Sequence, residues 1–439
     1  MSIVEDYVRR TPTSGKLHER GRKVFPGGYT RSTILVDYPY PTYIQRALGC
    51  RVWDVDGNEY IDYINNYGPL LLGHNNPAVV EAVKQQLETI WSGAVTETEV
   101  KLAEKVKELY PCAERMLFCP TGSEACMKAV RTYRAISGKE KIAMFKGAYH
   151  GSSDSLSFQE GTPTDFLSKV VLLPYDEIEG VERLIELYKD ELAAVLLEPT
   201  MGRMGHKPAH PDFYKALREI TRKKGIPLVI DEIVDGFRLA PGGAQQRFGI
   251  QADMTMLGKV LGGGFPLAAF ASSEEVMSIW GIQESTSLDI VGPRIANTGT
   301  FNDTKISIAA GLATIEQLTP DLYKHLEKIG DEMRGGMKKI FSGLRIKAQV
   351  TGISSMFSIF FTGKPIVNSD SMVHVNKLVY RCFAMSLLNK GVIIGKGGNP
   401  SFCSAAMTEE DIKQTLKAAE ETLSEMLPLI KEIAPTLID

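Results

Sequence analysis

The 439-residue chain lacks several features that would narrow its function at once. It has six cysteines, and none of them stands in a C-x-x-C pair or at metal-ligand spacing from a histidine. This excludes a cysteine-rich zinc or disulfide scaffold. Because a chain of this length can bury a large core without such supports, we expect reduced, mostly buried thiols and no bound metal.

Charge of one sign and long apolar runs are equally scarce. The net charge is -3 at pH 7, so no basic field is available for nucleic acid or an anionic membrane. No apolar stretch reaches the length of a membrane span, and the charged residues Met1 to Arg10 do not resemble a signal peptide. We therefore expect a soluble, cytoplasmic protein with neither a nucleic-acid nor a membrane partner.

From about Asn76 onward, helical patterns alternate with short apolar segments. Such alternation predicts an α/β fold with a mainly parallel sheet that is covered by helices. Two of the expected helices span Glu124–Ile136 and Pro211–Lys224. The expected strands are Arg115–Cys119, Lys141–Phe145, Ala193–Leu197, Pro227–Ile230 and Met254–Leu257.

The two ends of the chain show different patterns. Residues Met1 to about Lys23 predict helix, and Arg51–Tyr63 predicts a hairpin. A long helical region over Ile306–Ser342 leads to short strands near Ile346–Phe361. We therefore expect a large domain over residues 71–310 and a smaller α+β domain over residues 311–439, which residues 1–70 join.

Two glycine-containing segments follow strands of the expected large domain, and parallel α/β sheets bind their ligands at that edge. Thr121, Gly122 and Ser123 open a helix, where unpaired N–H groups and the helix dipole favour a phosphate. A simple N-cap is the alternative. Tyr149 lies in the loop between Gly147 and Gly151, where its ring can stack on a planar ligand or merely pack the loop.

Two ionisable residues also follow apolar strands. Asp231 is placed to bind a pyridinium nitrogen, although it could cap a helix or hold Mg²⁺ instead. Lys259 has apolar flanks and a neighbouring glycine run, Gly262–Gly264, that would leave room for a bulky cofactor. Burial would lower its pKa, and a neutral amine forms Schiff bases. Together the four features suit one molecule, pyridoxal 5'-phosphate (PLP), because they match its phosphate, ring face, ring nitrogen and aldehyde.

The sequence resembles the class III aminotransferases, which are PLP enzymes of fold type I, over nearly its whole length. The resemblance implies a mainly parallel seven-stranded-type sheet in the large domain, and a homodimer with shared active sites. The matching segments are TGSEA (Thr121–Ala125), AYHG (Ala148–Gly151), LLEPTMG (Leu196–Gly202), LVIDEIVDGFR (Leu228–Arg238), ADMTMLGKVLGGGFPLAAF (Ala252–Phe270) and NTGTFND (Asn297–Asp303).

The resemblance also implies roles for individual residues. Lys259 would hold PLP as a Schiff base, with Asp231 as the second catalytic residue. Arg31 would bind a substrate carboxylate through its guanidinium fork, or form only a surface salt bridge, and Arg238 is a second candidate. The implied cofactor-binding residues are Thr121, Gly122, Ser123, Tyr149, His150, Glu198, Asp231 and Lys259, with Thr300 reaching the phosphate of the neighbouring subunit.

Two branches of the family are similar to different segments. Trp53–His74 resembles the glutamate-1-semialdehyde 2,1-aminomutases, whereas Pro26–Pro41 and Phe237–Gly243 resemble the aminotransferases that act on β-amino acids. The aminomutases carry a longer gating segment after the Tyr-His-Gly motif, which helps to retain their intermediate. We therefore favour an aminotransferase. It would move an amino group between a keto acid and either an amine or an amino acid, with β-amino acids as one option. An aminomutase, an amino-acid epimerase and a non-catalytic PLP- or nucleotide-binding protein remain alternatives.

Overall fold

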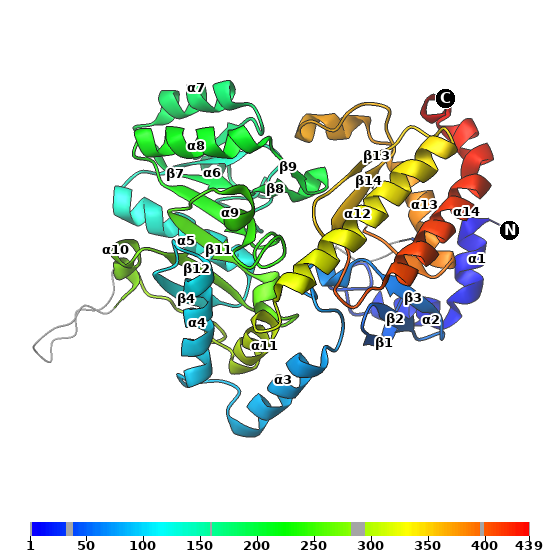
Figure 1. The fold of residues 1–439 in the computed structure, drawn as a ribbon, viewed down its shortest axis with the longest axis horizontal. Coiled ribbons are helices and arrows are strands. Elements are labelled where there is room, and N and C mark those ends of the chain that lie inside the picture. The colour runs from blue at the N-terminus through cyan, green and yellow to red at the C-terminus, as the bar shows by residue number, and fades with distance from the viewer. Residues whose placement is uncertain (1, 32–37, 159, 282–294, 396–398, 439) are drawn as a thin grey trace, which may run out of the picture. The chain divides into compact units, whose positions relative to one another are not determined.

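The computed structural model describes residues 2–31, 38–158, 160–281, 295–395 and 399–438 (Figure 1). The chain forms two compact units. The first unit comprises Met1–Asn76, Arg203–Lys207 and Pro320–Asp439, and the second unit comprises Pro77–Gly202 and Pro208–Thr319. In the described residues, no helix is both long and apolar enough to span a bilayer.

The described part of the second unit contains a sheet of seven strands. All neighbours in it are parallel except β12, which runs antiparallel to both β4 and β11. The predicted mainly parallel α/β fold is therefore confirmed, and each of the five predicted strands is present. In spatial order the strands are β4 (Arg115–Cys119), β12 (Ala268–Ser272), β11 (Met254–Leu257), β10 (Leu228–Glu232), β7 (Leu192–Leu197), β5 (Lys141–Phe145) and β6 (Val170–Leu173).

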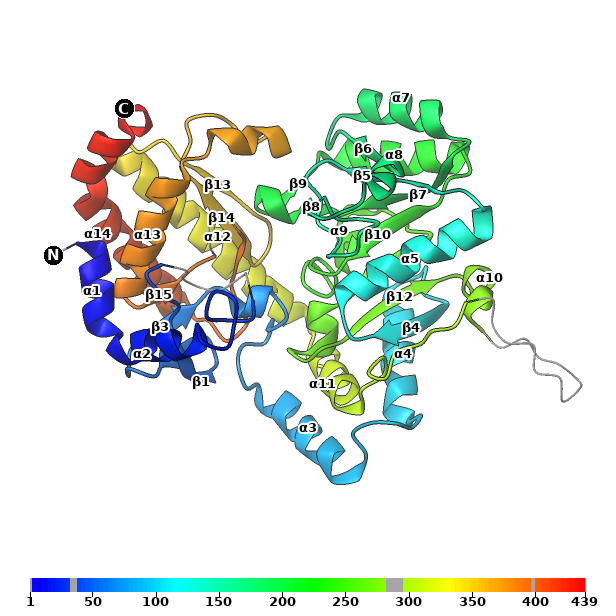
Figure 2. The same cartoon turned by 180° about the vertical axis from the view of Figure 1, so that it is seen from behind.

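The central strands of this sheet are buried at every residue, as expected of strands with helices on both faces. Helix α5 (Gly122–Ser137) packs across β12, β11 and β7 (Figure 2). The other helices of the unit are α3 (Pro77–Thr89), α4 (Glu97–Leu109), α6 (Thr164–Ser168), α7 (Ile178–Tyr188), α8 (Pro211–Lys223), α9 (Gly243–Phe248), α10 (Glu274–Met277) and α11 (Lys305–Ile315), and short strands β8 (Thr200–Met201) and β9 (Lys207–Pro208) follow β7.

The described residues of the first unit form two small sheets. The predicted hairpin is formed by antiparallel strands β2 and β3, whose turn places Gly57 at φ +88°. Strand β15 adds to β3 in parallel, so the sheet combines both ends of the chain. The first sheet contains β1 (Ile44–Leu48), β2 (Arg51–Asp54), β3 (Glu59–Asp62) and β15 (Val392–Ile393), and the second contains β13 (Gln349–Thr351), β14 (Met356–Phe360) and β16 (Ser401–Phe402).

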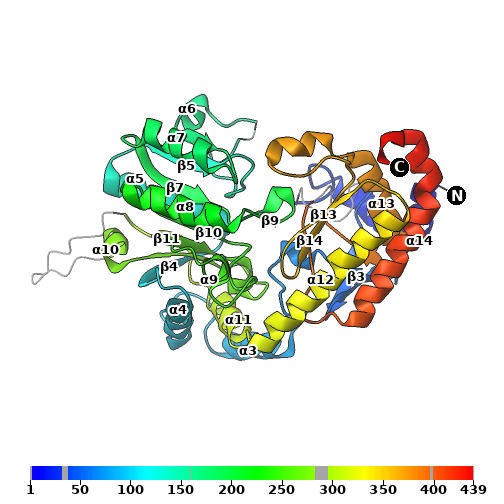
Figure 3. The same ribbon diagram turned by 45° about the horizontal axis from the view of Figure 1, so that its top comes forward.

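Two helical stretches that the sequence predicted as continuous are each divided at a proline. The helical stretch predicted from Met1 is two helices, α1 (Ile3–Arg10) and α2 (Pro12–Gly21). The long helical region predicted over Ile306–Ser342 is also two helices, α11 and α12 (Pro320–Gly343), because Pro320 begins a new helix rather than continuing the old one. Helices α12 and α14 (Glu409–Ile433) lie side by side (Figure 3), and α13 (Lys377–Asn389) also packs on α14.

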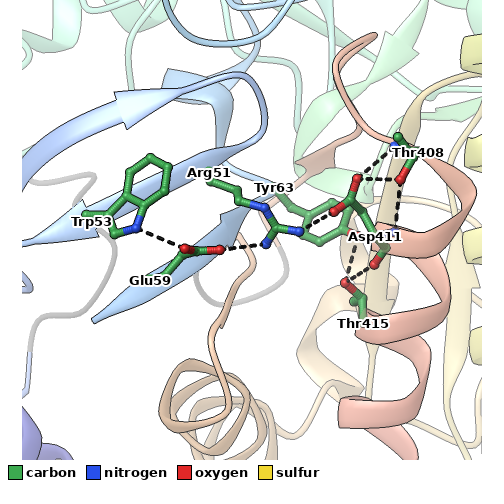
Figure 4. A network of polar contacts seen from close by, with 7 residues as sticks. All are labelled: Arg51, Trp53, Glu59, Tyr63, Thr408, Asp411 and Thr415. Carbon is green, nitrogen blue, oxygen red and sulfur yellow. Dashed lines mark hydrogen bonds and ion pairs between the residues drawn. The ribbon is translucent and has the colours of Figure 1, made fainter. Parts of the chain in front are cut away.

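A polar network joins β2 and β3 to the start of α14 (Figure 4). Arg51 lies with Nη1 3.1 Å from Glu59 Oε1 and donates through Nη2 to Asp411 Oδ1 at 2.6 Å. Asp411 also completes a capping box with Thr408 at the start of α14. Since Asp411 is buried, this arrangement fixes the N-terminal strands against the C-terminal helix.

Candidate active site

Four parallel strands of the second unit, β5, β7, β10 and β11, end at one edge of the sheet, and a functional side chain follows or closes each. Asp231 lies near the end of β10, and Lys259 follows β11, which is its direct neighbour. Glu198 follows β7, and His150 lies in the loop after β5. The sheet therefore brings these four predicted residues to the edge where α/β proteins bind ligands.

The Asp231 carboxylate is held from two sides. His150 Nδ1 lies 2.7 Å from Asp231 Oδ2, and the backbone N–H of Ile233 donates to Oδ1 at 3.0 Å. The Cys126 thiol, on α5, donates to Oδ2 at 3.5 Å. His150 Nε2 is buried and has no hydrogen-bond partner among the described residues. Because Asp231 and His150 are both buried, the pair is shielded from water.

Cysteine, histidine and carboxylate are also metal ligands, and the ligand atoms of Cys126, His150 and Asp231 lie within 4.8 Å of one another. Two atoms bound to one zinc ion would be about 3.3 Å apart in tetrahedral geometry. The 2.7 Å between His150 and Asp231 is instead the separation of a charge-assisted hydrogen bond. We therefore describe the group as a hydrogen-bonded pair with a neighbouring thiol.

Glu198 fixes the loop that carries Tyr149. Its two carboxylate oxygens accept the backbone N–H groups of Tyr149 and Gly202, each at 3.1 Å. Burial raises the pKa of Glu198 to about 7, although the neighbouring His150 and the two N–H donors oppose this rise. The Tyr149 ring itself is half exposed.

Lys259 has an unusual backbone conformation. Its φ is +48°, in the left-handed region that residues other than glycine rarely adopt. Backbone strain of this kind concentrates at functional sites. Burial lowers the pKa of Lys259, while the negative charges of Asp231 and Glu198 act in the opposite direction. A lowered pKa makes the unprotonated amine more available at neutral pH.

One glycine of the run after Lys259 is needed for close packing and does not leave space for the cofactor. At Gly263, with φ +56°, an added Cβ would lie 2.3 Å from Thr314 Oγ1 and 2.7 Å from the carbonyl oxygen of Ala310. Both of those residues belong to α11. The expectation that this run leaves room for the cofactor is therefore wrong at Gly263, where the close approach of α11 requires glycine.

The start of α5 combines a cap with two unpaired donors. Thr121 accepts the backbone N–H of Glu124 through its hydroxyl, so the N-cap role holds. In the described part of the chain, the N–H groups of Gly122 and Ser123 have no acceptor. Ser123 Oγ accepts the N–H of Ser152. The helix therefore presents two backbone donors together with its dipole, an arrangement that suits phosphate.

Three further predicted residues belong to the two units. Thr300 is exposed on a loop of the second unit, and Arg238 is fully buried in the same unit, where its charge contributes to lowering the pKa of Lys259. Arg31 belongs to the first unit, where its Nη1 donates to Asn66 Oδ1 at 2.5 Å and its guanidinium lies 5.5 Å from the centre of the Tyr67 ring. The sequence did not predict that the Cys126 thiol contacts Asp231. A usable signal is that Cys126 lies one helical turn after Gly122, because residues at this spacing share one face of a helix.

Residues 36–423 match the family model described as aminotransferase class-III. The chain belongs to this family. It is 37% identical over 424 residues to a glutamate-1-semialdehyde 2,1-aminomutase of Methanothermobacter thermautotrophicus, covering 94% of this chain and 99% of that protein. An ω-transaminase of Sphaerobacter thermophilus is 35% identical, with a TM-score of 0.86 over 95% of this chain and 99% of that one. A β-phenylalanine aminotransferase of Variovorax paradoxus is 29% identical, with a TM-score of 0.89 over 97% of both chains.

These relatives confirm the predicted family, the fold type and a PLP-dependent enzyme. One further neighbour, 30% identical with a TM-score of 0.88, is a transaminase with PLP bound. The residues of this class III aminotransferase fit that cofactor, because two unpaired N–H groups, a buried carboxylate and a lysine of lowered pKa occur in one unit. PLP is therefore the cofactor.

Proposed function

We propose that this enzyme is an aminotransferase that moves an amino group between an amino acid or amine and a keto acid. The proposal rests on Lys259, which has a lowered pKa and a left-handed backbone conformation. It lies at the same edge of the sheet as the Asp231–His150 pair. The similarity to the ω-transaminase and to the β-phenylalanine aminotransferase makes β-amino acids the first donors to test.

When bound, PLP supplies an aldehyde that takes up amines and a ring that stabilises the negative charge left by removal of a proton. We assign the covalent attachment of the cofactor to Lys259. Once the incoming amine has displaced it, the Lys259 amine would take the proton from the substrate carbon and return it at the cofactor carbon, as a general base and acid. A lowered pKa suits this role, because the released amine must be unprotonated to accept that proton.

Asp231 would hold the proton on the ring nitrogen. For that, its carboxylate has to stay charged and correctly oriented. His150 and the N–H of Ile233 each bind one of its oxygens, and together they fix the orientation of the carboxylate. We therefore assign His150 to a positioning role behind Asp231.

We assign the cofactor phosphate to the N–H groups of Gly122 and Ser123, with Thr300 of a second copy completing the site. The proposed enzyme is then a homodimer with shared active sites. The exposure of Thr300 supports this assignment, because an exposed hydroxyl is available to another chain. Arg31, as a guanidinium fork, would bind the carboxylate of the substrate.

An aminomutase is the second candidate, since the relatives at 37% identity carry that name. After His150 the chain passes through a short segment to α6 and β6, without the longer insertion that favours retention of an intermediate. This difference supports the aminotransferase.

A donor screen tests the proposal. The purified enzyme would be given α-amino acids, β-amino acids, simple amines and glutamate 1-semialdehyde, each with and without 2-oxoglutarate. Turnover that requires the keto acid supports an aminotransferase. Conversion of the semialdehyde without any keto acid would establish the aminomutase instead, and racemisation without a co-substrate would establish an epimerase.

A further inference from the structure

The tip of the loop Asn297–Thr304 is exposed, and its C-terminal end is buried. Thr300 and Phe301 are exposed, whereas Asn302 and Lys305 are buried. Lys305 Nζ lies 2.6 Å from Glu99 Oε2 and 2.7 Å from Asp303 Oδ2, so the C-terminal end of the loop is anchored by ion pairs. The loop is thus a surface element with a fixed base.

Lys128, on α5, supports the other part of this loop. Only 4% of its side chain is exposed, and its Nζ lies 3.5 Å from Asn302 Oδ1 and 3.4 Å from Glu124 Oε2. Both separations are at the long limit for hydrogen bonds. A buried ammonium with such long contacts costs free energy, so fold stability alone does not account for a lysine at this position.

Lys128 and the carbonyl group of Asn297 together set which way the Asn302 amide faces. The amide oxygen faces the ammonium, and the NH₂ group donates to the carbonyl oxygen of Asn297 at 3.2 Å. A flipped amide would place NH₂ hydrogens against the ammonium. The backbone N–H of Asn302 also donates to Gly299 at 3.2 Å, and an added Cβ on Gly299 would lie 2.3 Å from Asn302 Oδ1. Asn302 therefore positions the residues directly before Thr300, and Lys128 helps to hold the amide of Asn302 in place.

We propose that Lys128 is a positioning residue that holds the Asn297–Thr304 loop in the conformation with which Thr300 contacts the cofactor phosphate of a second copy of this chain. This inference rests on the proposed homodimer with shared sites. Lys128 would thus raise the PLP affinity of the site in the other subunit rather than that of its own site.

The Lys128→Met substitution separates this role from a purely structural one. Methionine keeps a similar length and removes the desolvation cost of the buried ammonium, so the melting temperature should change little. Glu124 is one-third exposed, so its carboxylate can remain hydrated. Loss of one phosphate contact should weaken PLP binding about tenfold, in line with the value of hydrogen bonds to charged groups. The matched control is Lys101→Met on α4, which breaks an exposed i,i+4 pair with Glu97.

Mixed dimers test whether the effect crosses between subunits. Lys128→Met chains would be paired with Lys259→Ala chains, and PLP titrated while the absorbance of lysine-bound PLP is followed. Only the site of the Lys128→Met chain can bind PLP covalently, and its phosphate would meet the intact loop of the other chain. We expect wild-type affinity there. The reference pairs Lys128→Met chains with Lys259→Ala/Lys128→Met chains, in which the tenfold loss should remain.

Three outcomes would overturn the inference. Unchanged PLP affinity in the Lys128→Met homodimer removes its premise. Weak binding that persists in the mixed dimer assigns Lys128 to its own site, and a large drop in melting temperature assigns it to the fold. A wild-type protein that sediments as a monomer, or that binds no PLP, would contradict the proposed function itself and is detected before any variant is made.

Discussion

Glu198 provides a test in which the magnitude follows from the structure. Burial raises its pKa from 4.5 to about 7. The unfolded chain therefore loses this proton at lower pH than the folded chain, so the folded state binds more protons between these values and its stability falls as the pH rises. A difference of this size corresponds to roughly 3 kcal/mol of unfolding free energy lost between pH 5 and pH 8.

Glu198→Gln removes this titration while keeping the shape of the side chain. The amide NH₂ would face one of the two N–H groups that Glu198 now accepts, which costs about 1–3 kcal/mol at every pH. Because that cost is constant, it cancels in the slope. The stability of the variant relative to the wild type should therefore rise by roughly 3 kcal/mol from pH 5 to pH 8.

Urea unfolding of the PLP-free protein at several pH values measures this slope, provided that the m value is the same for both proteins. Glu182→Gln, at an exposed position of α7, is the control and should give a curve parallel to that of the wild type. If Glu198→Gln also ran parallel to the wild type, the buried carboxyl would be ionised throughout, and the account of its environment would be wrong.

Three further predictions concern the reaction. Lys259→Ala should abolish turnover and the visible absorbance of lysine-bound PLP, and retention of either would refute its role. His150→Leu should lower kcat by roughly 5- to 150-fold, because Asp231 Oδ2 loses a donor worth about 1–3 kcal/mol; His150→Asn, whose amide can still donate, should recover part of the rate, whereas equal losses would indicate a packing defect. Arg31→Ala should raise KM for donors with a carboxylate far more than for simple amines, and Arg31→Lys should be intermediate because it keeps the charge but loses the fork. Equal effects on both donor classes would make Arg31 structural.

Local sequence signals sufficed to give both ends of three strands in the seven-stranded sheet. β4, β5 and β11 begin and end at the predicted residues, because each is a short, mainly apolar run bounded by charged, glycine or proline residues. Strand β12 was missed, since Ala268–Ser272 is rich in alanine and follows a glycine run. Its strand character depends on pairing with residues far away in sequence, as Phe270 lies opposite both Met256 and Leu117.

Some features of the active site were likewise predicted from the sequence, and others were missed. Because adjacent parallel strands end together, the sequence predicted that Asp231 and Lys259 lie at one edge of the sheet. It did not reveal that His150 faces Asp231, which follows from the conformation of a loop, nor that the Cys126 thiol approaches the same carboxylate from a helix. The requirement for glycine at position 263 comes from α11, a contact that no local pattern encodes.

The first unit is assembled from the beginning and the end of the chain, and this has a consequence for synthesis. Arg51 and Asp411 are separated by 360 residues, so at about 5–20 residues per second a ribosome needs roughly 20 to 70 seconds to supply the partner. During that interval β3 lacks β15 and exposes an unpaired strand edge, which is open to other nascent chains. Slower elongation or a lack of chaperones should therefore reduce the yield of this protein more than that of a protein whose domains are contiguous in sequence.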